Sequence, residues 1–422
     1  MEKHRKKLIK NAAVFDGHSS GLAQGKKIVI EDDIVTEITA DEVSEENFDE
    51  VFDGTGMVAM PGMTDAHVHM GCLFAKGEFP VDYATVLTVA KCKDALMAGF
   101  TTFRDAGSVS EGLKLAFDEG GLPGPRIYPC GAYISQTCGH GDSEYAHTYR
   151  DIQYRHPSST VLADGVPQII RAVREQFYRG ASHIKLMAGG GCMSSCDPIE
   201  TVQFTAEEMK AACDVAADYG TYVMAHLYTP KAILRALGAG VRSLEHAHLI
   251  DETAAEQVAA AGAFLNPMPQ FKKYEDMLGV ENMPPKDEMV CCAEATATEI
   301  LNRHEDIRLL FGTDMMITGP DYQVEQSEDI RYYEKRFGTM RALRALTGTA
   351  NEVFALTTYQ NPYPKGKIGV LEAGSYADLL LVDGDPTKSV SVLADTDHLR
   401  LIMKGGTVYK TTLCGDFMPL IR

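Results

Sequence analysis

Residues 57–70 read Met-Val-Ala-Met-Pro-Gly-Met-Thr-Asp-Ala-His-Val-His-Met, an apolar run that ends in a His-x-His pair. In an extended strand, residues i and i+2 point to the same face, so the imidazoles of His67 and His69 converge on one point. Two convergent neutral imidazoles suit a borderline-soft cation such as Zn²⁺. Because a lone His-x-His pair also arises by chance, partners elsewhere in the chain must decide whether it binds a metal.

Further polar residues with suitable chemistry stand at the ends of other apolar runs. They are Lys185 in His-Ile-Lys-Leu-Met, His226 in Val-Met-Ala-His, His246 in Leu-Glu-His-Ala and Asp314 in Phe-Gly-Thr-Asp. Each has an ordinary alternative on its own, such as a histidine bonded under a loop or an aspartate that caps the next helix. Their repeated position at strand ends favours a shared metal site. His248 has the same parity as His246, so spacing does not choose between them.

Between about residues 62 and 355, short apolar runs alternate with amphipathic stretches. The predicted strands span residues 63–70, 101–105, 126–134, 183–187, 221–226, 243–246, 264–268 and 309–314. The predicted helices span residues 82–98, 165–179, 206–219, 230–237, 252–261 and 285–302, with apolar residues at three- and four-residue spacing. Eight strand–helix alternations favour a closed parallel (β/α)₈ TIM barrel, in which the carboxyl ends of the strands form the catalytic face.

The two ends of the chain have a different pattern, with short alternating strands and turn signals. These strands span residues 28–30, 34–38, 378–382 and 401–403, and Lys404-Gly405-Gly406 is a predicted hairpin turn. We therefore expect an α/β protein in two parts. A barrel would occupy residues 62–364, and a small discontinuous β-sandwich domain would be built from residues 1–61 and 365–422.

Composition excludes several classes of protein. The net charge of −19 argues against a nucleic-acid partner, because such binding depends on clustered Lys and Arg. No apolar stretch approaches the 18 residues of a membrane span, and no apolar segment follows the basic run of residues 3–10 as in a signal peptide. Ten scattered cysteines favour a reduced cytoplasmic protein.

Lys185 is the unusual candidate. A protonated ammonium has no lone pair and would repel a cation. A lysine fits among metal ligands only if its amine becomes anionic, as when CO₂ addition gives a carbamate. The alternative is a lysine paired with Asp197 or Glu200.

This set of residues resembles the amidohydrolase superfamily, in its binuclear-metal branch. There a His-x-His ends strand 1, a carboxylated lysine that bridges two metals ends strand 4, histidines end strands 5 and 6, and an aspartate ends strand 8. The resemblance covers nearly the whole chain, including Thr-Phe-Arg-Asp-Ala-Gly at residues 102–107 and Gly-x-x-Ala-Asp-Leu from residue 374. Residues 139–142, 184–191, 225–230 and 242–246 are similar to the imidazolonepropionase-related group that contains Xaa-Pro dipeptidases and ochratoxinase-like enzymes.

The resemblance implies a role for each candidate residue. The first metal falls to His67 and His69, the bridge to N6-carboxylated Lys185, the second metal to His226 and His246, and the roles of ligand and base to Asp314. The Glu-His motif of the family favours His246 over His248. His140 would face the substrate near the scissile carbonyl or the terminal carboxylate, with Tyr228 toward the same end. Two divalent cations are implied, and Zn²⁺ is the expected metal.

The implied function is hydrolysis of the amide bond of a dipeptide or N-acyl amino acid, as by an Xaa-Pro dipeptidase, through attack of a metal-bridging hydroxide. One alternative is a mononuclear imidazolonepropionase, a deaminase or a lactonase-like hydrolase of the same superfamily. Lys185 argues against the mononuclear branches, which lack the bridging lysine. The non-enzyme alternative is a metal-free scaffold paralogue, against which the complete ligand set argues. The expected partners are a small-molecule or dipeptide substrate and further copies of the chain in a homo-oligomer.

Two segments depart from the family pattern, namely residues 316–325, with Gly-Pro-Asp-Tyr at 319–322, and residues 361–364. Because loops after barrel strands set substrate choice, the chemistry follows from the resemblance but the substrate does not.

Overall fold

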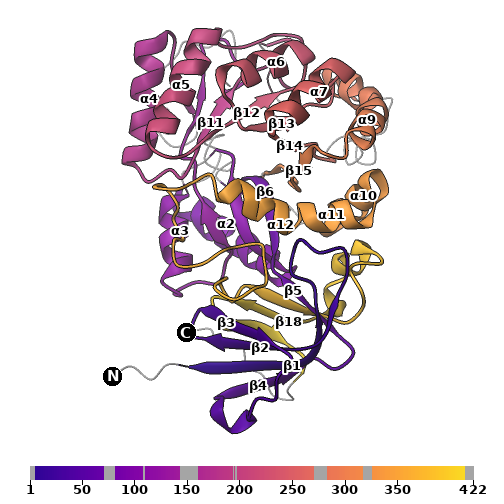
Figure 1. The fold of residues 1–422 in the computed structure, drawn as a ribbon. Coiled ribbons are helices and arrows are strands. Elements are labelled where there is room, and N and C mark those ends of the chain that lie inside the picture. The colour runs from indigo at the N-terminus through magenta and orange to yellow at the C-terminus, as the bar shows by residue number, and fades with distance from the viewer. Residues whose placement is uncertain are drawn as a thin grey trace.

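The computed structural model describes residues 5–70, 81–107, 110–142, 160–192, 194, 197–269, 283–316 and 326–413. The molecule has an upper part, in which helices surround parallel strands, and a lower part made of strands from both ends of the chain (Figure 1). Residues 317–325, which include the departure at 319–322, lie outside the described residues.

Two parallel sheets form the centre of the upper part. One has the order β16-β6-β7-β8, with bounds Met315–Met316, Met63–His69, Phe100–Asp105 and Arg126–Tyr128. The other has the order β10-β9-β11-β12-β13-β14-β15, with bounds Thr160–Leu162, Tyr133–Ser135, Ile184–Met187, Val223–Leu227, Ser243–His246, Phe264–Asn266 and Arg308–Leu309. The prediction of alternating parallel strands is thus confirmed.

Further backbone hydrogen bonds link the two sheets through residues next to their strands. On one side β6 pairs with the segment between β15 and β16, since Ala66 N donates to Phe311 O at 2.8 Å and Asp314 N donates to His67 O at 2.9 Å. On the other side Ser182 N donates to Pro129 O at 2.6 Å. Since all the pairings are parallel, the carboxyl ends of the strands face the same side of the molecule.

Two of the predicted strands differ in detail. The stretch predicted at 126–134 is divided into β8 and β9. Of the stretch predicted at 309–314, only Leu309 lies in a strand, at the end of β15, and β16 begins just beyond that stretch at Met315. Asp314, the last residue of that stretch, adopts a left-handed backbone conformation with φ of 52°, which a regular strand does not include.

The helices enclose the parallel strands. Their bounds are α2 Val81–Met97, α3 Glu111–Asp118, α4 Val166–Tyr178, α5 Ala206–Asp218, α6 Pro230–Ala239, α7 Glu252–Ala261, α9 Pro285–Arg303, α10 Gln326–Phe337, α11 Thr339–Ala345 and α12 Gly348–Phe354. The six helices predicted from periodicity are present within two residues at each end, whereas α3 and α10–α12 were not predicted. Local chemistry fixes several starts, as in α5, where Thr205 and Glu208 form a capping box.

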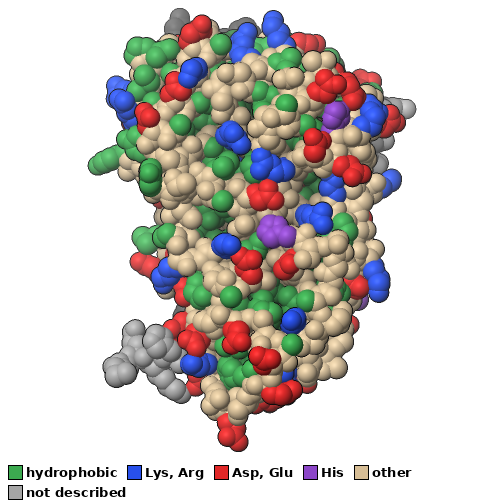
Figure 2. Space-filling model, in the orientation of Figure 1, with side chains coloured by type: hydrophobic (Ala, Val, Ile, Leu, Met, Phe, Trp, Pro, Cys, Tyr) green, Lys and Arg blue, Asp and Glu red, His purple; other side chains and the backbone are tan. Residues whose placement is uncertain are grey.

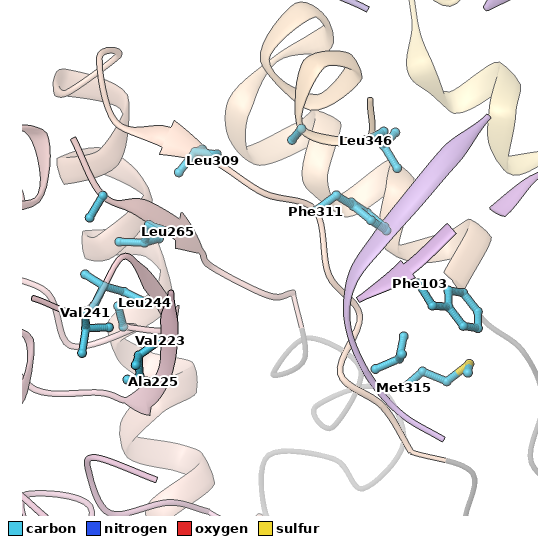
Figure 3. Close-up of a cluster of buried hydrophobic side chains, with 14 of the residues drawn as sticks. Phe103, Val223, Ala225, Val241, Leu244, Leu265, Leu309, Phe311, Met315 and Leu346 are labelled. Atoms are coloured by element: carbon cyan, nitrogen blue, oxygen red, sulfur yellow. The ribbon is translucent and has the colours of Figure 1, made fainter. Parts of the chain in front are cut away.

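Apolar side chains fill the space around both parallel sheets. In Figure 3, Val223, Leu244, Leu265 and Leu309 lie on successive strands, and Phe311 lies near Leu346. Parallel sheets covered on both faces have near-continuous apolar strands of this kind. The polar candidates at the strand ends are therefore exceptions in an apolar environment.

The lower part is one mixed sheet of strands from both ends of the chain. Its order is β19-β18-β17-β5-β1-β2-β3, with β4 also paired to β1, and the bounds are Thr407–Thr411, Leu399–Lys404, Leu379–Val382, Val58–Pro61, Lys6–Val14, Ala23–Glu31, Ile34–Thr39 and Glu50–Asp53 for β4. The predicted hairpin turn is confirmed, because Gly405 and Gly406 connect β18 to β19 with φ of 54° and 69°.

A buried ion pair joins β8 to the terminal sheet. Arg126 Nε and Nη2 lie 2.6 and 3.1 Å from the two carboxylate oxygens of Asp378, and the Arg126 guanidinium lies 4.0 Å from the centre of the Tyr376 ring. Tyr363, in the divergent segment 361–364, receives a hydrogen bond at its hydroxyl from Ile127 N at 2.9 Å. This segment therefore contacts β8 next to the terminal sheet.

The surface in Figure 2 has Lys and Arg side chains interspersed with Asp and Glu. None of the helices in the described part of the chain is both long enough and apolar enough to span a bilayer.

Candidate metal centre

Three side chains converge where β6 ends and where the chain enters β16. His67 Nε2 lies 3.2 Å from His69 Nε2 and 3.5 Å from Asp314 Oδ1, and His69 Nε2 lies 3.3 Å from the same oxygen. With metal–nitrogen distances of 2.0–2.1 Å, two ligand atoms of a tetrahedral zinc site are roughly 3.3 Å apart. These residues therefore form a candidate metal site with the donor spacing that one cation requires.

Lys185 of β11 ends beside this site. Its side chain is buried, and Nζ lies 3.3 Å from His67 Nε2. Burial lowers the pKa of its amine below the ordinary value of 10.5. Asp197, one alternative partner, lies 3.5 Å from His140 Nδ1 and 3.7 Å from Lys286 Nζ instead. Within the described residues, no ion pair joins Lys185 to Asp197 or Glu200.

His226 of β12 and His246 of β13 also lie close to His67. Their ring centroids are 4.4 Å apart, and those of His67 and His246 are 5.4 Å apart. His226 Nε2 lies 3.2 Å from Gly190 O, which leaves Nδ1 as its available nitrogen. His246 Nδ1 is buried without a hydrogen-bond partner among the described residues, a state that costs about 1–3 kcal/mol and that a bound metal would relieve.

The pKa values of these four histidines favour the neutral imidazole, which is the form that binds a metal. Burial lowers the pKa of His67, His226 and His246 well below 6.5, and that of His69 below 6.5. The rings are therefore neutral at pH 7, as metal ligation requires.

The structure separates His246 from His248. His248 Nε2 lies 2.8 Å from Met268 O, and burial lowers the pKa of this ring to about 3. Its ring centroid is 6.3 Å from that of His246. His248 thus contacts the backbone that follows β14, while His246 faces the other imidazoles.

Two candidate ligands have strained backbones. His246 and the adjacent Ala247 have φ of 70° and 53°, and Asp314 has φ of 52°. Left-handed conformations cost about 1–3 kcal/mol at such residues and are concentrated at functional sites. The strain turns both side chains at the ends of their strands and indicates a functional constraint.

Two buried carboxylates that the sequence analysis did not single out support the ligands. Asp65 accepts hydrogen bonds from Thr313 Oγ1 at 2.6 Å and Thr313 N at 3.1 Å, directly before Asp314. Glu245 Oε2 lies 2.8 Å from His67 Nδ1. Their presence inside apolar strands was the available signal, since fully buried carboxylates are rare unless they are paired.

His140 and Tyr228 flank the two histidines on β12 and β13. The His140 ring is stacked on His226 at 4.0 Å, and its Nδ1 lies 2.8 Å from Ser194 Oγ. The Tyr228 ring lies 5.2 Å from His226 and 5.1 Å from His246. Both residues assigned to the substrate by resemblance therefore border the candidate centre.

A lysine from α9 fixes the loop that supports His140. Lys286 Nζ donates to Gly191 O at 2.9 Å and to Ser194 O at 2.8 Å, and also to Asp197 O. With these acceptors Nζ uses all three of its donors. Lys286 thus connects α9 to the loop that holds Ser194 against His140, a connection that the sequence analysis did not foresee.

Comparison with known proteins agrees with this geometry. Residues 58–415 match the model of the amidohydrolase family. An ochratoxinase from Aspergillus niger is 29% identical over an alignment of 379 residues that covers 84% of this chain and 76% of that protein. A prolidase crystallised with N-methylphosphonate-L-proline is 32% identical, with a TM-score of 0.86 over 96% of this chain and 100% of the other.

A second solved structure supports the same relationship. A Xaa-Pro dipeptidase with methionine bound in its active site is 26% identical, with a TM-score of 0.80 over 96% of this chain and 100% of the other. The resemblance seen in the sequence is thereby confirmed. With most of its length matched by one family model, the chain belongs to the amidohydrolase family and is a hydrolase that acts on C–N bonds.

Proposed function

We propose that this protein hydrolyses the amide bond of a dipeptide or N-acyl amino acid at a centre of two divalent cations. One observation carries the proposal. The donor atoms of His67, His69 and Asp314 are 3.2–3.5 Å from one another, and Lys185 Nζ is 3.3 Å from His67 Nε2. A lysine at that distance belongs to a metal site only as an anion.

The residues that would hold the metals follow from this arrangement. His67 and His69 would bind the first cation, His226 and His246 the second, and Asp314 would also be a ligand. Lys185 would bridge them as a carbamate, formed when the neutral amine adds to CO₂ with a new N–C bond and loss of one proton. Imidazole and carboxylate oxygen ligands suit Zn²⁺, which is the expected metal.

When bound, the two cations would lower the pKa of a shared water toward neutrality and polarise the amide carbonyl. Asp314 would take the proton of the attacking water and deliver it to the leaving nitrogen. His140 has its Nδ1 engaged with Ser194, so its Nε2 would face the scissile carbonyl or the terminal carboxylate. Tyr228 would bind the same end of the substrate.

The relatives support the class of substrate. The prolidase was crystallised with a phosphonate derivative of proline, and ochratoxinase and Xaa-Pro dipeptidase are further relatives. We infer that the leaving amine belongs to an amino acid with a free carboxylate, with proline as the first candidate. A tertiary X–Pro amide has no N–H, so a site that acts chiefly through the carbonyl would accept it.

A metal assay combined with a substrate panel tests the function. We expect about two cations per chain and turnover of N-acyl amino acids or dipeptides. One cation with turnover of lactones or imidazolones would indicate the mononuclear or lactonase-like alternative. A protein with neither metal nor turnover would be a scaffold paralogue.

Features of the whole chain form part of the same proposal. The backbone bonds at Ala66 and Ser182 support closure of the two parallel sheets into one (β/α)₈ barrel over residues 62–364. The pairing of β17 with β5 supports a domain composed of residues 1–61 and 365–422, for which a β-sandwich stays a prediction.

A homo-oligomer and a cytoplasmic location also stay predictions. Light scattering of the purified protein tests whether the chain forms a homo-oligomer.

A further inference from the structure

His67 has a buried carboxylate behind its ring. Its Nδ1 lies 2.8 Å from Glu245 Oε2, and both side chains are fully buried. An ionised carboxylate only accepts hydrogen bonds, so Nδ1 carries the hydrogen and Nε2 carries the lone pair. Nε2 is the nitrogen that faces His69 and Asp314. The contact therefore selects the tautomer of His67 that can bind a metal in the candidate site.

Glu245 is itself held by a buried arginine from another strand. Arg104 Nη2 of β7 lies 2.9 Å from Glu245 Oε1, and Ser243 Oγ donates to the same oxygen at 2.7 Å. Arg104 Nε donates to Ala66 O at 2.7 Å, next to His67 in the chain. Both carboxylate oxygens of Glu245 thus have hydrogen-bond partners. The carboxylate cannot rotate away from His67 without breaking its ion pair with Arg104.

The buried ion pair between Arg104 and Glu245 is not explained by its effect on stability alone. Removing two charges from water costs several kcal/mol per ion, and well-packed apolar residues often stabilise a protein at least as well. Arg104 and Glu245 nevertheless lie among the apolar strands of the upper part with no exposed surface. Among the described residues, the side chain of Glu245 contacts the candidate centre at His67, and that of Arg104 contacts the backbone carbonyl of Ala66 directly before it.

Other candidate ligands are oriented by weaker acceptors. His69 Nδ1 lies 3.1 Å from Gly107 O, and His226 Nε2 lies 3.2 Å from Gly190 O. Among the described residues, Nδ1 of His67 contacts a charged carboxylate, whereas His69 Nδ1 and His226 Nε2 contact neutral carbonyl oxygens. A carboxylate behind an imidazole fixes the ring and raises its basicity as a ligand.

We propose that Glu245, held by Arg104, is a positioning residue that raises the metal affinity of the site made by His67, His69 and Asp314. The inference rests on the proposed function, because it assumes that this site binds a cation. Neither residue is assigned a contact with substrate. Their effect would be exerted entirely through the tautomer and orientation of His67.

Glu245→Gln tests this directly, because the amide oxygen can still accept a hydrogen bond while the charge is lost. Asp378→Asn is the matched control, since it removes the charge from another buried arginine–carboxylate pair, between β8 and the terminal sheet. Zinc bound per chain is measured against free zinc in metal-buffered solutions. We expect one of two sites in Glu245→Gln to bind about 10–100-fold more weakly, and Asp378→Asn to match the wild type.

The outcomes separate this inference from the proposed function. A wild-type protein that binds no metal overturns the proposed function. Two metals in the wild type with equal affinities in Glu245→Gln overturn the positioning role alone. If Glu245→Gln does not fold, Ser243→Ala replaces it, because that variant removes one donor to Glu245 and keeps the ion pair. A smaller loss of affinity at one site is then expected, and wild-type affinity overturns the inference.

Discussion

The imidazole of His140 lies flat against that of His226, with ring centroids 4.0 Å apart and planes inclined by 7°. Gly191 packs tightly against the His140 ring, since a Cβ added there would lie 2.1 Å from His140 Cε1. The loop after β11 and the ring of His226 thus fix His140 in one orientation beside the candidate centre. Because His140 is held so tightly, a small change at Gly191 should move its ring and reveal whether it takes part in the reaction.

Gly191→Ala should displace His140 from His226 and leave the metal ligands unchanged. A misplacement of about 1 Å in a catalytic group can lower activity by ~10²-fold, so we expect a fall of that order in kcat with unchanged metal content. Gly112→Ala is the control, because a Cβ there meets no atom within 4 Å. Equal kcat in both variants would exclude His140 from the reaction.

Lys185→Ala should lower metal occupancy and abolish turnover, because it removes the proposed bridging anion. Small carboxylates added to the solution should restore part of the activity by occupying the vacated position. Lys210→Ala, at an exposed lysine paired with Asp214, is the control. Full metal content and normal turnover in Lys185→Ala would disprove the carbamate bridge.

Asp314→Asn separates metal binding from proton transfer, because the amide keeps an oxygen donor but is not a base. We expect most of the metal to remain while kcat falls by ~10² or more, the usual effect of losing a general base. Asp214→Asn, on the exposed face of α5, controls for loss of a carboxylate. An unchanged kcat would transfer the proton-shuttle role to His140, the next candidate.

Recognition of the free carboxylate of the substrate can be tested by comparing kcat/KM for an N-acyl amino acid with kcat/KM for its C-terminal amide. A site built to pair that group leaves buried polar partners unpaired when the group is neutralised, so kcat/KM should fall strongly. Tyr228→Phe should raise KM more than it lowers kcat if the hydroxyl contributes uniform binding. Equal kcat/KM for acid and amide would instead favour a lactonase-like hydrolase.

Lys404 should make stability depend on pH. Burial lowers the pKa of its amine from 10.5 to about 8, and Nζ donates to Gly124 O at 2.5 Å. Between these pH values the unfolded chain binds the proton and the folded chain does not, so the contribution of Lys404 to the free energy of unfolding rises with pH. Across the whole window this contribution amounts to about 3 kcal/mol.

Denaturant unfolding of the wild type and Lys404→Met at pH 7.5 to 10 measures this contribution. The difference in free energy of unfolding should shift in favour of the wild type as the pH rises. Lys388→Met is the control for loss of an exposed lysine. A difference for Lys404→Met that stays constant with pH would contradict the lowered pKa.

Much of the fold was predictable because periodicity and local chemistry act within short segments. Ile169, Val173 and Phe177 repeat at helical spacing and lie on the buried face of α4. Helix α10 was missed because most of its residues are polar, and its position depends on contacts distant in sequence, such as Gln326 with Asp65. The stretch 309–314 was predicted as one strand because an apolar run reveals neither that only Leu309 lies in a strand nor that the residue at 314 is left-handed.

The sequence by itself determined the candidate ligand types, since residues 67, 69, 185, 226, 246 and 314 stand at the ends of predicted strands that parallel pairing must bring to one side. Tertiary structure alone decided which atoms meet. It directed His248 to Met268 O and left His246 near His67, although both histidines share one parity. It also brought Arg104 to Glu245 from distant strands. Alternation fixes the face on which a side chain lies, but distances across the interior depend on how all the strands pack together.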